Sequence, residues 1–307
     1  MTDAMAGRLL SAELASRWRT DGWCVIAGAF SGAELADAQA AVRGLFPSAE
    51  EMDAGVDDER TSVWRRTDGA PWPEFPFDSA PLNRLVVSEA LIDMAQELLA
   101  VTDVRLYQAT LTAKYSNQSS GYNQLLHTDY PNHTIVVPRP DDGYQQLETY
   151  IYLSDVTADD GATRLVSRRL TDGIPVERHT LRYDDYAHLY AEPGDASGPA
   201  GSVVAYRPDV YHRAVDVSEP GRSRFMLHVA YKAAEAEWAG YQAWQFKGFT
   251  PAWHNFVQGA GVRQLGVVGF PAPGHPYWTE ETLRGVQARY PNLDMDPWKA
   301  AFTVGSG

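Results

Sequence analysis

The segment Leu126-His127-Thr128-Asp129 determines how the rest of this chain is interpreted. A histidine and an aspartate two positions apart on an extended strand point to the same side, because side chains alternate along a strand with period two. A second histidine, His212, lies far downstream in the valine-rich strand pattern of residues 210–217. Two imidazoles and one carboxylate can hold a divalent iron on one octahedral face and leave the opposite face open. His127, Asp129 and His212 are therefore the predicted metal ligands and catalytic residues.

An isolated His-x-Asp pair is weak evidence, because it occurs by chance in many proteins of this length. The order of features favours a metal site here: a strand with one polar face, the His-x-Asp pair, a strand that ends at a glycine turn, the second histidine, and a strand opened by arginine. The other six histidines are expected to be turn, surface or hydrogen-bonded core residues: His133, His179, His188, His228, His254 and His275.

The hydrophobic pattern of residues 104–114 alternates with period two, which predicts a strand. A polar face turned into a small barrel is costly unless it lines a binding cavity, so we favour a pocket wall over a solvent-exposed face. The polar face holds Gln108, Thr110, Thr112 and Lys114, and the opposite face holds Tyr107, Ala109, Leu111 and Ala113.

Further strands are predicted at residues 147–154, 202–206, 210–217 and 224–232, with 202–206 and 210–217 paired through the turn Arg207-Pro208-Asp209. Helices are predicted at residues 11–18 and 88–99. A further helix is predicted to begin at a capping box of Ser31 and Glu34 and to end at Pro47, and a short strand is predicted to begin at Trp23. Residues 48–85 are predicted to be irregular, either folding over a pocket or forming a solvated loop. The pattern indicates a mainly β (α+β) fold, a double-stranded β-helix or jelly roll with helical cover.

We interpret residues 1–307 as a single catalytic domain. Residues 1–103 form an N-terminal helical cover, 104–232 the jelly-roll core and 233–307 a C-terminal extension. The aromatic rings of that extension either pack on the barrel exterior or build a substrate lid or an oligomer face. These residues are Trp238, Tyr241, Trp244, Phe246, Phe249, Trp253 and Phe256.

The composition limits the partners and the compartment. Lys and Arg number 26 against 40 Asp and Glu, a formal net charge of −14, which disfavours nucleic acid and anionic membranes. Cys24 is the only cysteine, so an internal disulfide framework is excluded and a reducing cytoplasm is expected. The sequence has no apolar stretch of about 18 residues, so it predicts no membrane span. We expect a cytoplasmic enzyme with a small-molecule substrate, and the sequence leaves homo-oligomer formation open.

Taken together, the motifs resemble the phytanoyl-CoA dioxygenase family of Fe(II)/2-oxoglutarate-dependent oxygenases, over roughly residues 10 to 232. The order of the motifs matches as well as their type. The matching segments are Asp21-Gly-Trp-Cys-Val-Ile26, Tyr107-Gln108 with Lys114, Leu126-His-Thr-Asp129, the strand and glycine turn from Tyr150 to Gly161, and His212.

The resemblance implies that iron(II) is held by the His-Asp-His set and that 2-oxoglutarate and O2 are co-substrates. The distal carboxylate of 2-oxoglutarate would be bound by an arginine. Arg222 and Arg224 are both candidates, because they share strand parity. Arg224 fits the family spacing better, and its planar guanidinium suits a carboxylate. Lys114 would add a second positive charge, the alternative being a surface lysine at a strand end. Tyr150 and Gln108 would border the co-substrate.

The implied reaction is hydroxylation of an aliphatic C–H bond with decarboxylation of 2-oxoglutarate to succinate. A carboxylate at position 129 argues against halogenation, since related halogenating enzymes have a small residue there. Desaturation, epimerisation and ring closure stay open, and so does the identity of the substrate. Two other hypotheses are a cupin-like isomerase or 2-oxoglutarate-independent oxygenase, and a non-catalytic binding module on the same fold.

Overall fold

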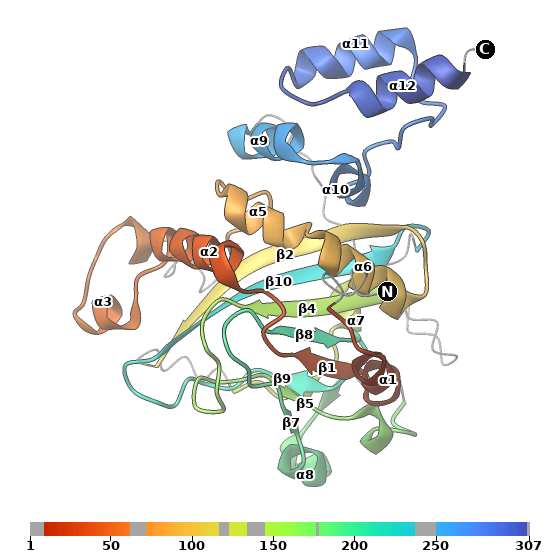
Figure 1. Cartoon of the computed structure of the whole chain (residues 1–307). Helices are drawn as coiled ribbons and strands as arrows, with labels where there is room; N and C mark the ends of the chain where they lie inside the picture. The colour runs from red at the N-terminus through yellow and green to blue at the C-terminus, as the bar shows by residue number, and fades with distance from the viewer. Residues whose placement is uncertain are drawn as a thin grey trace.

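Two five-stranded antiparallel sheets face each other in this computed structural model, which describes residues 9–61, 72–116, 123–133, 145–175, 178–236 and 250–305 (Figure 1). This arrangement confirms the predicted jelly roll with helical cover. The first sheet has the order β1 (Trp23–Ile26), β8 (Val203–Tyr206), β4 (Gln146–Tyr152), β10 (Ser223–Ala233) and β2 (Val104–Tyr115). The second has the order β6 (Thr180–Leu181), β3 (Leu126–His127), β9 (His212–Arg213), β5 (Arg164–Leu165) and β7 (Gly194–Asp195).

Strand β10 lies at the centre of the long part of the first sheet, between β2 and β4. Its apolar side chains alternate with polar ones, so the sheet has an outer face buried under helices and an inner face directed towards the second sheet. Leu111, Ile151 and Leu227 are fully buried on the outer face. The inner face carries the polar row predicted for β2.

Tyr107 is an exception to the predicted alternation. The register shifts between Ala230, which pairs with Gln108, and Tyr231, which pairs with Leu106. Tyr107 is therefore the extra residue of a β-bulge, and its hydroxyl donates to Glu148 on the inner face. The prediction that Tyr107 shares the apolar face is wrong for this reason.

Helices α2 (Gly32–Leu45), α5 (Ala80–Val86) and α6 (Glu89–Leu99) cover the outer face of the first sheet (Figure 1). Helix α1 (Ala12–Asp21) packs beside β1, and α3 (Ala49–Asp53) lies to one side of α2. The predicted amphipathic stripe of α6 is confirmed, since Leu91, Ala95 and Leu98 are buried. The capping box predicted for α2 is wrong, because the Ser31 side chain makes no capping hydrogen bond.

The prediction that residues 48–85 are irregular is wrong in part, because this range contains α3 and the start of α5. Helix α3 begins at a capping box in which the Ser48 hydroxyl accepts from the Glu51 N–H at 3.1 Å and the Glu51 carboxylate accepts from the Ser48 N–H at 2.8 Å. Helix α5 begins after Ser79, whose hydroxyl accepts from the Leu82 N–H. Residues 62–71 lie outside the described part of the chain.

The predicted hairpin of residues 202–206 and 210–217 is not formed. Strand β8 pairs with β1 and β4 in the first sheet, whereas β9 pairs with β3 and β5 in the second, and β9 has only two residues. The Arg207 guanidinium donates to both carboxylate oxygens of Asp209 at 3.0 Å and fixes the turn. The turn thus moves the chain from one sheet to the other. Shorter elements in this part are α7 (Tyr130–His133), η1 (Arg168–Leu170) and α8 (Tyr183–Ala191).

The described part of the C-terminal extension packs on the helical cover, on the far side of the first sheet from the second (Figure 1). Its helices are α9 (Pro251–Gly259), α10 (Val262–Val267), α11 (Glu280–Arg289) and α12 (Asp296–Gly305). Trp253 and Phe256 are buried in the core shared with α5 and α6. The other five aromatic residues singled out in the sequence lie outside the described residues: Trp238, Tyr241, Trp244, Phe246 and Phe249.

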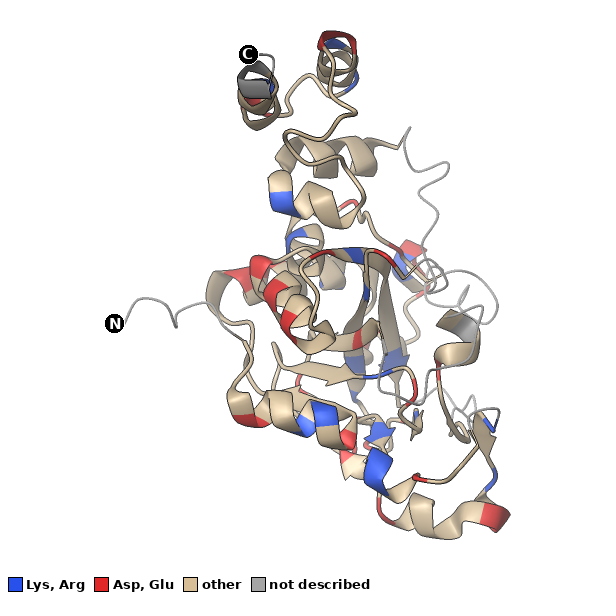
Figure 2. Ribbon diagram, turned by 90° about the vertical axis from the view of Figure 1, so that its right-hand side faces the viewer, with Lys and Arg blue, Asp and Glu red and all other residues tan. Residues whose placement is uncertain are grey.

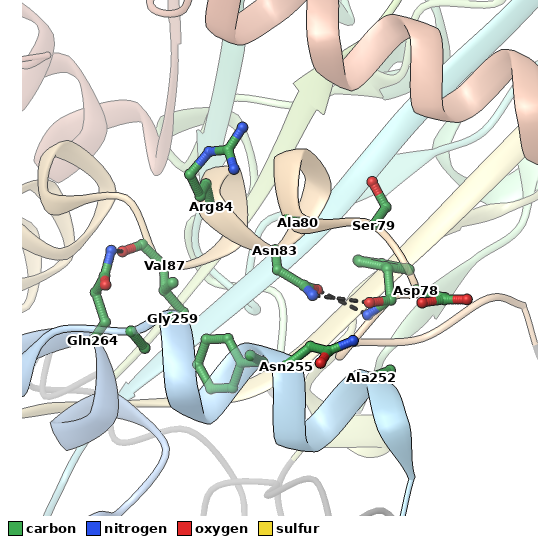
Figure 3. A pocket seen from close by; sticks show the side chains of 13 residues that line it. Asp78, Ser79, Ala80, Asn83, Arg84, Val87, Ala252, Asn255, Gly259 and Gln264 are labelled. Atoms are coloured by element: carbon green, nitrogen blue, oxygen red, sulfur yellow. Dashed lines mark hydrogen bonds between the residues drawn. The ribbon is translucent and has the colours of Figure 1, made fainter. Parts of the chain in front are cut away.

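A pocket of about 230 Å³ lies between α5 and α9. Figure 3 shows its polar lining, where the Asn83 side chain accepts from the Phe77 N–H at 2.8 Å and donates to the Phe77 carbonyl at 2.9 Å. The Gln264 amide donates to the Val87 carbonyl at 3.3 Å. These groups tie the cover helices together, and the pocket lies on the outer side of the sheet, away from the predicted metal ligands.

Acidic and basic positions are intermingled over the helices and loops (Figure 2). None of the helices in the described ranges has the length and apolar character that crossing a bilayer requires.

Candidate metal centre

The predicted metal ligands come together at the centre of the second sheet. His127 at the end of β3 pairs directly with His212 at the start of β9, and their ring centroids are 4.6 Å apart. Asp129 follows two residues after His127, and its N–H donates to the Pro208 carbonyl at 3.0 Å. Its carboxylate oxygens lie 3.7 Å from His127 Nε2 and 3.3 Å from His212 Nε2. The three ligand atoms all lie within 4.8 Å of one another.

Backbone hydrogen bonds fix both imidazoles in one tautomer. His127 Nδ1 is 2.8 Å from the Leu125 carbonyl, and His212 Nδ1 is 3.0 Å from the Val210 carbonyl. A carbonyl only accepts, so each Nδ1 carries the proton and each Nε2 presents its lone pair to Asp129 and the space beside it. Histidine ligands of metals use this arrangement, in which the second ring nitrogen donates to a carbonyl.

A chain of two tyrosines supports Asp129. The Tyr206 hydroxyl donates to Asp129 Oδ2 at 2.9 Å, and Tyr150 lies 2.7 Å from the Tyr206 oxygen, so Tyr150 must donate to Tyr206. Burial acts to raise the pKa of Asp129, but His212, the neighbouring imidazoles and the Tyr206 hydroxyl outweigh burial and leave the pKa lowered. Burial and His212 lower the pKa of His127. Asp129 therefore stays a carboxylate while His127 stays neutral, which are the protonation states that metal coordination needs.

The donor set fits a divalent iron. Two neutral imidazole nitrogens and one carboxylate form a facial triad, which is the ligand set of non-haem iron(II) oxygenases. The His127 side chain is 24% exposed and that of Asp129 is 12% exposed, so solvent reaches the place where the three atoms converge.

Two cations face each other on the inner face of the first sheet. Arg224 on β10 pairs across the strands with Lys114 on β2. Arg224 is 2% exposed, and within the described residues its Nε and Nη1 have no hydrogen-bond partner. Burial and the Arg224 charge lower the pKa of Lys114 to about 7, while Asp216 opposes them. Like charges directly opposite each other destabilise a sheet, so this pair indicates a site for an anion.

The structure distinguishes the two competing arginines. Arg222 is bound at the surface, where its Nε and Nη2 donate to the Asp160 carboxylate at 2.7 and 3.0 Å. Its side chain is 45% exposed. Arg224 is buried and keeps unpartnered donors, so it is the arginine that can bind a ligand between the sheets.

Tyr150 and Gln108 are both on the inner face but at different places. Tyr150 is next to the triad through Tyr206, and burial raises its pKa, with Arg224 acting against this. Gln108 lies in the cross-strand row of Ala230 and Glu148. It is six residues from Lys114 along β2, about 20 Å at the rise of an extended strand. Its contact with the co-substrate stays a prediction.

Sequence reasoning missed Tyr206, Glu148 and His228 as residues near the metal centre. The Tyr206 hydroxyl binds a ligand carboxylate, and Glu148 bonds to His228 on the same inner face. A signal was present, because Glu148 has the strand parity of Tyr150 and His228 has that of Arg224.

Residues 18–225 match the phytanoyl-CoA dioxygenase (PhyH) family, and they include all three triad residues. The chain belongs to the phytanoyl-CoA dioxygenase family. The resemblance drawn from the sequence is therefore confirmed. Among curated proteins, no match to this chain was found.

Solved structures of low sequence identity share the fold of this phytanoyl-CoA dioxygenase family protein. The carbocyclase SnoK from nogalamycin biosynthesis matches with 19% identity and a TM-score of 0.53, covering 76% of this chain and 87% of its own. EctD from S. alaskensis has 19% identity and a TM-score of 0.53, with coverages of 78% and 84%. HygX from Streptomyces hygroscopicus has 16% identity and a TM-score of 0.52, with coverages of 76% and 96%.

Replacing Tyr206 by Phe should weaken metal binding by about tenfold. The change removes the hydroxyl that donates to Asp129, and the loss of such supporting partners costs about 10- to 100-fold in metal affinity. Manganese(II) titration followed by electron paramagnetic resonance measures the effect. Tyr152→Phe is the matched control, because the Tyr152 hydroxyl donates to the Ala196 carbonyl instead. Equal losses in the two variants would show that Tyr206 does not act through Asp129.

Proposed function

We propose that this protein is an iron(II)- and 2-oxoglutarate-dependent dioxygenase that hydroxylates an aliphatic C–H bond of a small organic metabolite. Two observations carry the proposal: His127, Asp129 and His212 converge, and a buried arginine on the inner face of the first sheet has donors without a partner among the described residues. EctD was solved with bound Fe and HygX with nickel and 2-oxoglutarate, which supports the same cofactors here.

In this proposal His127, Asp129 and His212 hold the iron through two Nε2 atoms and one carboxylate oxygen. When bound, iron(II) with 2-oxoglutarate and dioxygen supplies the oxidising power for C–H cleavage, and 2-oxoglutarate is decarboxylated to succinate. Arg224 binds the distal carboxylate with its planar fork, and Lys114 adds a second positive charge. Tyr206 and Tyr150 keep the Asp129 carboxylate in place by hydrogen bonding.

The test is the dependence of succinate formation on each component. Purified protein with iron(II), 2-oxoglutarate and ascorbate should form succinate slowly even without substrate, and omission of iron or addition of a chelator should abolish this. Turnover that proceeds without 2-oxoglutarate would favour the cupin-like alternative, and absence of both iron binding and succinate would favour a binding module.

Hydroxylation is distinguished from the other outcomes by the product. Epimerase SnoN and carbocyclase SnoK share this fold, so the fold alone does not select the reaction. A hydroxylated product gains one oxygen atom from O2, whereas an epimer keeps its mass and a ring closure loses two hydrogens. Mass spectrometry under ¹⁸O2 separates these three results.

The affinity for 2-oxoglutarate should fall as the pH rises above about 7. Lys114 in the ligand-free protein has its pKa lowered to about 7 by burial and by Arg224. A bound carboxylate favours the charged ammonium and raises that pKa, so binding takes up a proton at pH values between the free and the bound pKa. Affinity then falls by up to about tenfold per pH unit in this window.

Calorimetric titration of the iron-loaded, oxygen-free protein with 2-oxoglutarate at about pH 8 measures this uptake. Two buffers with different ionisation enthalpies should give different apparent heats in the wild type. Lys114→Met should bind more weakly and give the same heat in both buffers. Proton uptake that persists in Lys114→Met would assign the titration to another group.

A further inference from the structure

A second polar cluster lies on the inner face of the first sheet, and the proposed mechanism does not use it. Glu148 is fully buried; its Oε1 accepts from the Tyr107 hydroxyl and its Oε2 is 2.8 Å from His228 Nε2. His133 Nδ1 is 3.0 Å from the Tyr107 oxygen. A buried carboxylate is costly, and here both of its oxygens are bonded. We call Tyr107, His133, Glu148 and His228 the inner cluster.

The hydrogen bonds of the inner cluster determine which nitrogens accept. A carboxylate accepts, so His228 Nε2 carries the proton and donates to Glu148. His228 Nδ1 is then a lone-pair acceptor, and within the described residues it has no hydrogen-bond partner. The Tyr107 hydroxyl donates its hydrogen bond to Glu148, so His133 Nδ1 donates to the Tyr107 oxygen and His133 Nε2 is likewise an acceptor. Burial lowers the pKa of His133 to about 4, which keeps that ring neutral.

His228 is connected to the metal centre through two tyrosine rings. Its ring centroid is 5.0 Å from that of Tyr150, which is 5.2 Å from Tyr206, which in turn is 5.0 Å from His212. The His228 side chain is 12% exposed, so a ligand can reach it. An acceptor of fixed orientation thus lies on the inner face of the first sheet, which faces the second sheet that carries the triad.

The inner face has two ends of opposite character. Arg224 and Lys114 supply positive charge at one end, whereas Glu148 supplies negative charge at the other, where the Lys232 ammonium beyond it donates to the Ala236 carbonyl. His228 is four residues from Arg224 along β10, about 13 Å at the rise of a strand. The cationic end suits the dicarboxylate co-substrate, and the end with Glu148 repels anions. The second molecule at this centre therefore meets an uncharged acceptor backed by a carboxylate.

We propose that His228, oriented by Glu148, is a substrate-recognition residue that accepts a hydrogen bond from a hydroxyl group, so that the substrate is a neutral alcohol. This inference rests on the proposed function and names the class of its substrate. A hydroxyl fits better than an ammonium group, because Tyr107 and His228 each contact one Glu148 oxygen and a ligand at His228 Nδ1 meets the neutral imidazole, not the carboxylate. A carboxylate or a coenzyme A thioester does not fit, because it would place negative charge beside Glu148.

The test compares two probes that differ in one donor. Cyclohexanol and methoxycyclohexane have similar size, but only the alcohol has an O–H. Saturation-transfer NMR on the full protein with zinc(II) and 2-oxoglutarate measures their dissociation constants. We expect the wild type to bind the alcohol about three- to tenfold more tightly than the ether. His228→Leu should bind the two probes equally, and His188→Leu, which changes an exposed histidine of α8, should keep the preference.

Two further variants separate recognition from folding. Glu148→Gln removes the charge that holds the proton on His228 Nε2, so the acceptor at Nδ1 is no longer enforced and the preference for the alcohol should fall. His228→Gln can donate its amide to Glu148 and offer a carbonyl acceptor, so it should restore part of the preference.

Equal binding of the two probes to the wild type, binding of neither, or an unchanged preference in His228→Leu would overturn the proposal. Iron-dependent succinate formation is measured separately. Succinate without alcohol preference would leave the proposed function intact and reject this inference, and alcohol preference without succinate would do the reverse.

Discussion

His127→Ala should abolish both the stabilisation of the protein by metal and the formation of succinate. We expect this variant to have the largest effect. Loss of a supporting partner already costs about 10- to 100-fold in metal affinity, and loss of a ligand costs more. A metal at 100 times its dissociation constant stabilises the wild type by about 2.7 kcal/mol. Thermal unfolding with and without manganese(II) should therefore show a rise in Tm for the wild type and none for His127→Ala.

Controls for this prediction use another histidine and the unfolding temperature without metal. His188 is exposed on α8, so His188→Ala should keep both the metal-induced rise in Tm and succinate formation. The metal-free Tm of His127→Ala should be close to that of the wild type, since the His127 side chain is partly exposed. An unchanged metal-induced rise in Tm in His127→Ala would refute its assignment as a ligand.

Part of the site could be predicted because two of its signals are local in the sequence. His127 and Asp129 share a side by strand parity, and residues 104–114 show their polar face through the same period. These patterns depend on single strands and do not need their partners. Even so, the pairing of His127 with His212 across β3 and β9 is a property of the fold, and motif order only indicated it.

The hairpin error has a physical cause. Two strand-like stretches separated by Arg207-Pro208-Asp209 carry the pattern of a β-turn, which also suits a crossing between two sheets. The crossing is stabilised by distant groups, since the Asp129 and Tyr130 N–H groups donate to the Pro208 carbonyl. No local pattern reports such contacts. The same crossing brings His212 to His127, so the prediction failed where the fold builds the site.

The other features that were not predicted differ in whether the sequence carries a signal for them. The Ser48-Ala-Glu-Glu51 capping box was readable in the sequence and predicts α3. Strand parity places Glu148 on the same side as Tyr150, but the hydrogen-bond partners of Glu148 and Tyr206 depend on the register of neighbouring strands. The bulge at Tyr107 likewise depends on the pairing of β2 with β10.

Arg224→Met should weaken 2-oxoglutarate binding by at least about 30-fold while making the ligand-free protein more stable. Removing one partner of a buried, hydrogen-bonded charge pair costs about 2–5 kcal/mol of binding free energy. Without the ligand, however, Arg224 is a buried charge opposite Lys114, and two Arg224 nitrogens have no hydrogen-bond partner in the part of the chain that the structure describes. Replacement of buried ion pairs by apolar side chains of similar volume is neutral or stabilises a protein by about 1–4 kcal/mol, and we expect a gain in this range for Arg224→Met. Calorimetric titration measures the binding, and chemical unfolding without ligand measures the stability.

Opposite changes in binding and stability identify a residue whose charge is kept for a ligand. A purely structural arginine would lose stability on substitution, and a residue outside the site would keep the binding. Arg222→Met is the matched control, two residues before Arg224 and just outside β10, and its ion pair with Asp160 predicts unchanged 2-oxoglutarate affinity and a lower stability. If Arg222→Met lost the binding and Arg224→Met kept it, the anchor would be Arg222. If Arg224→Met were less stable without ligand, the buried charge would have a structural partner and the anion site would lose its main support.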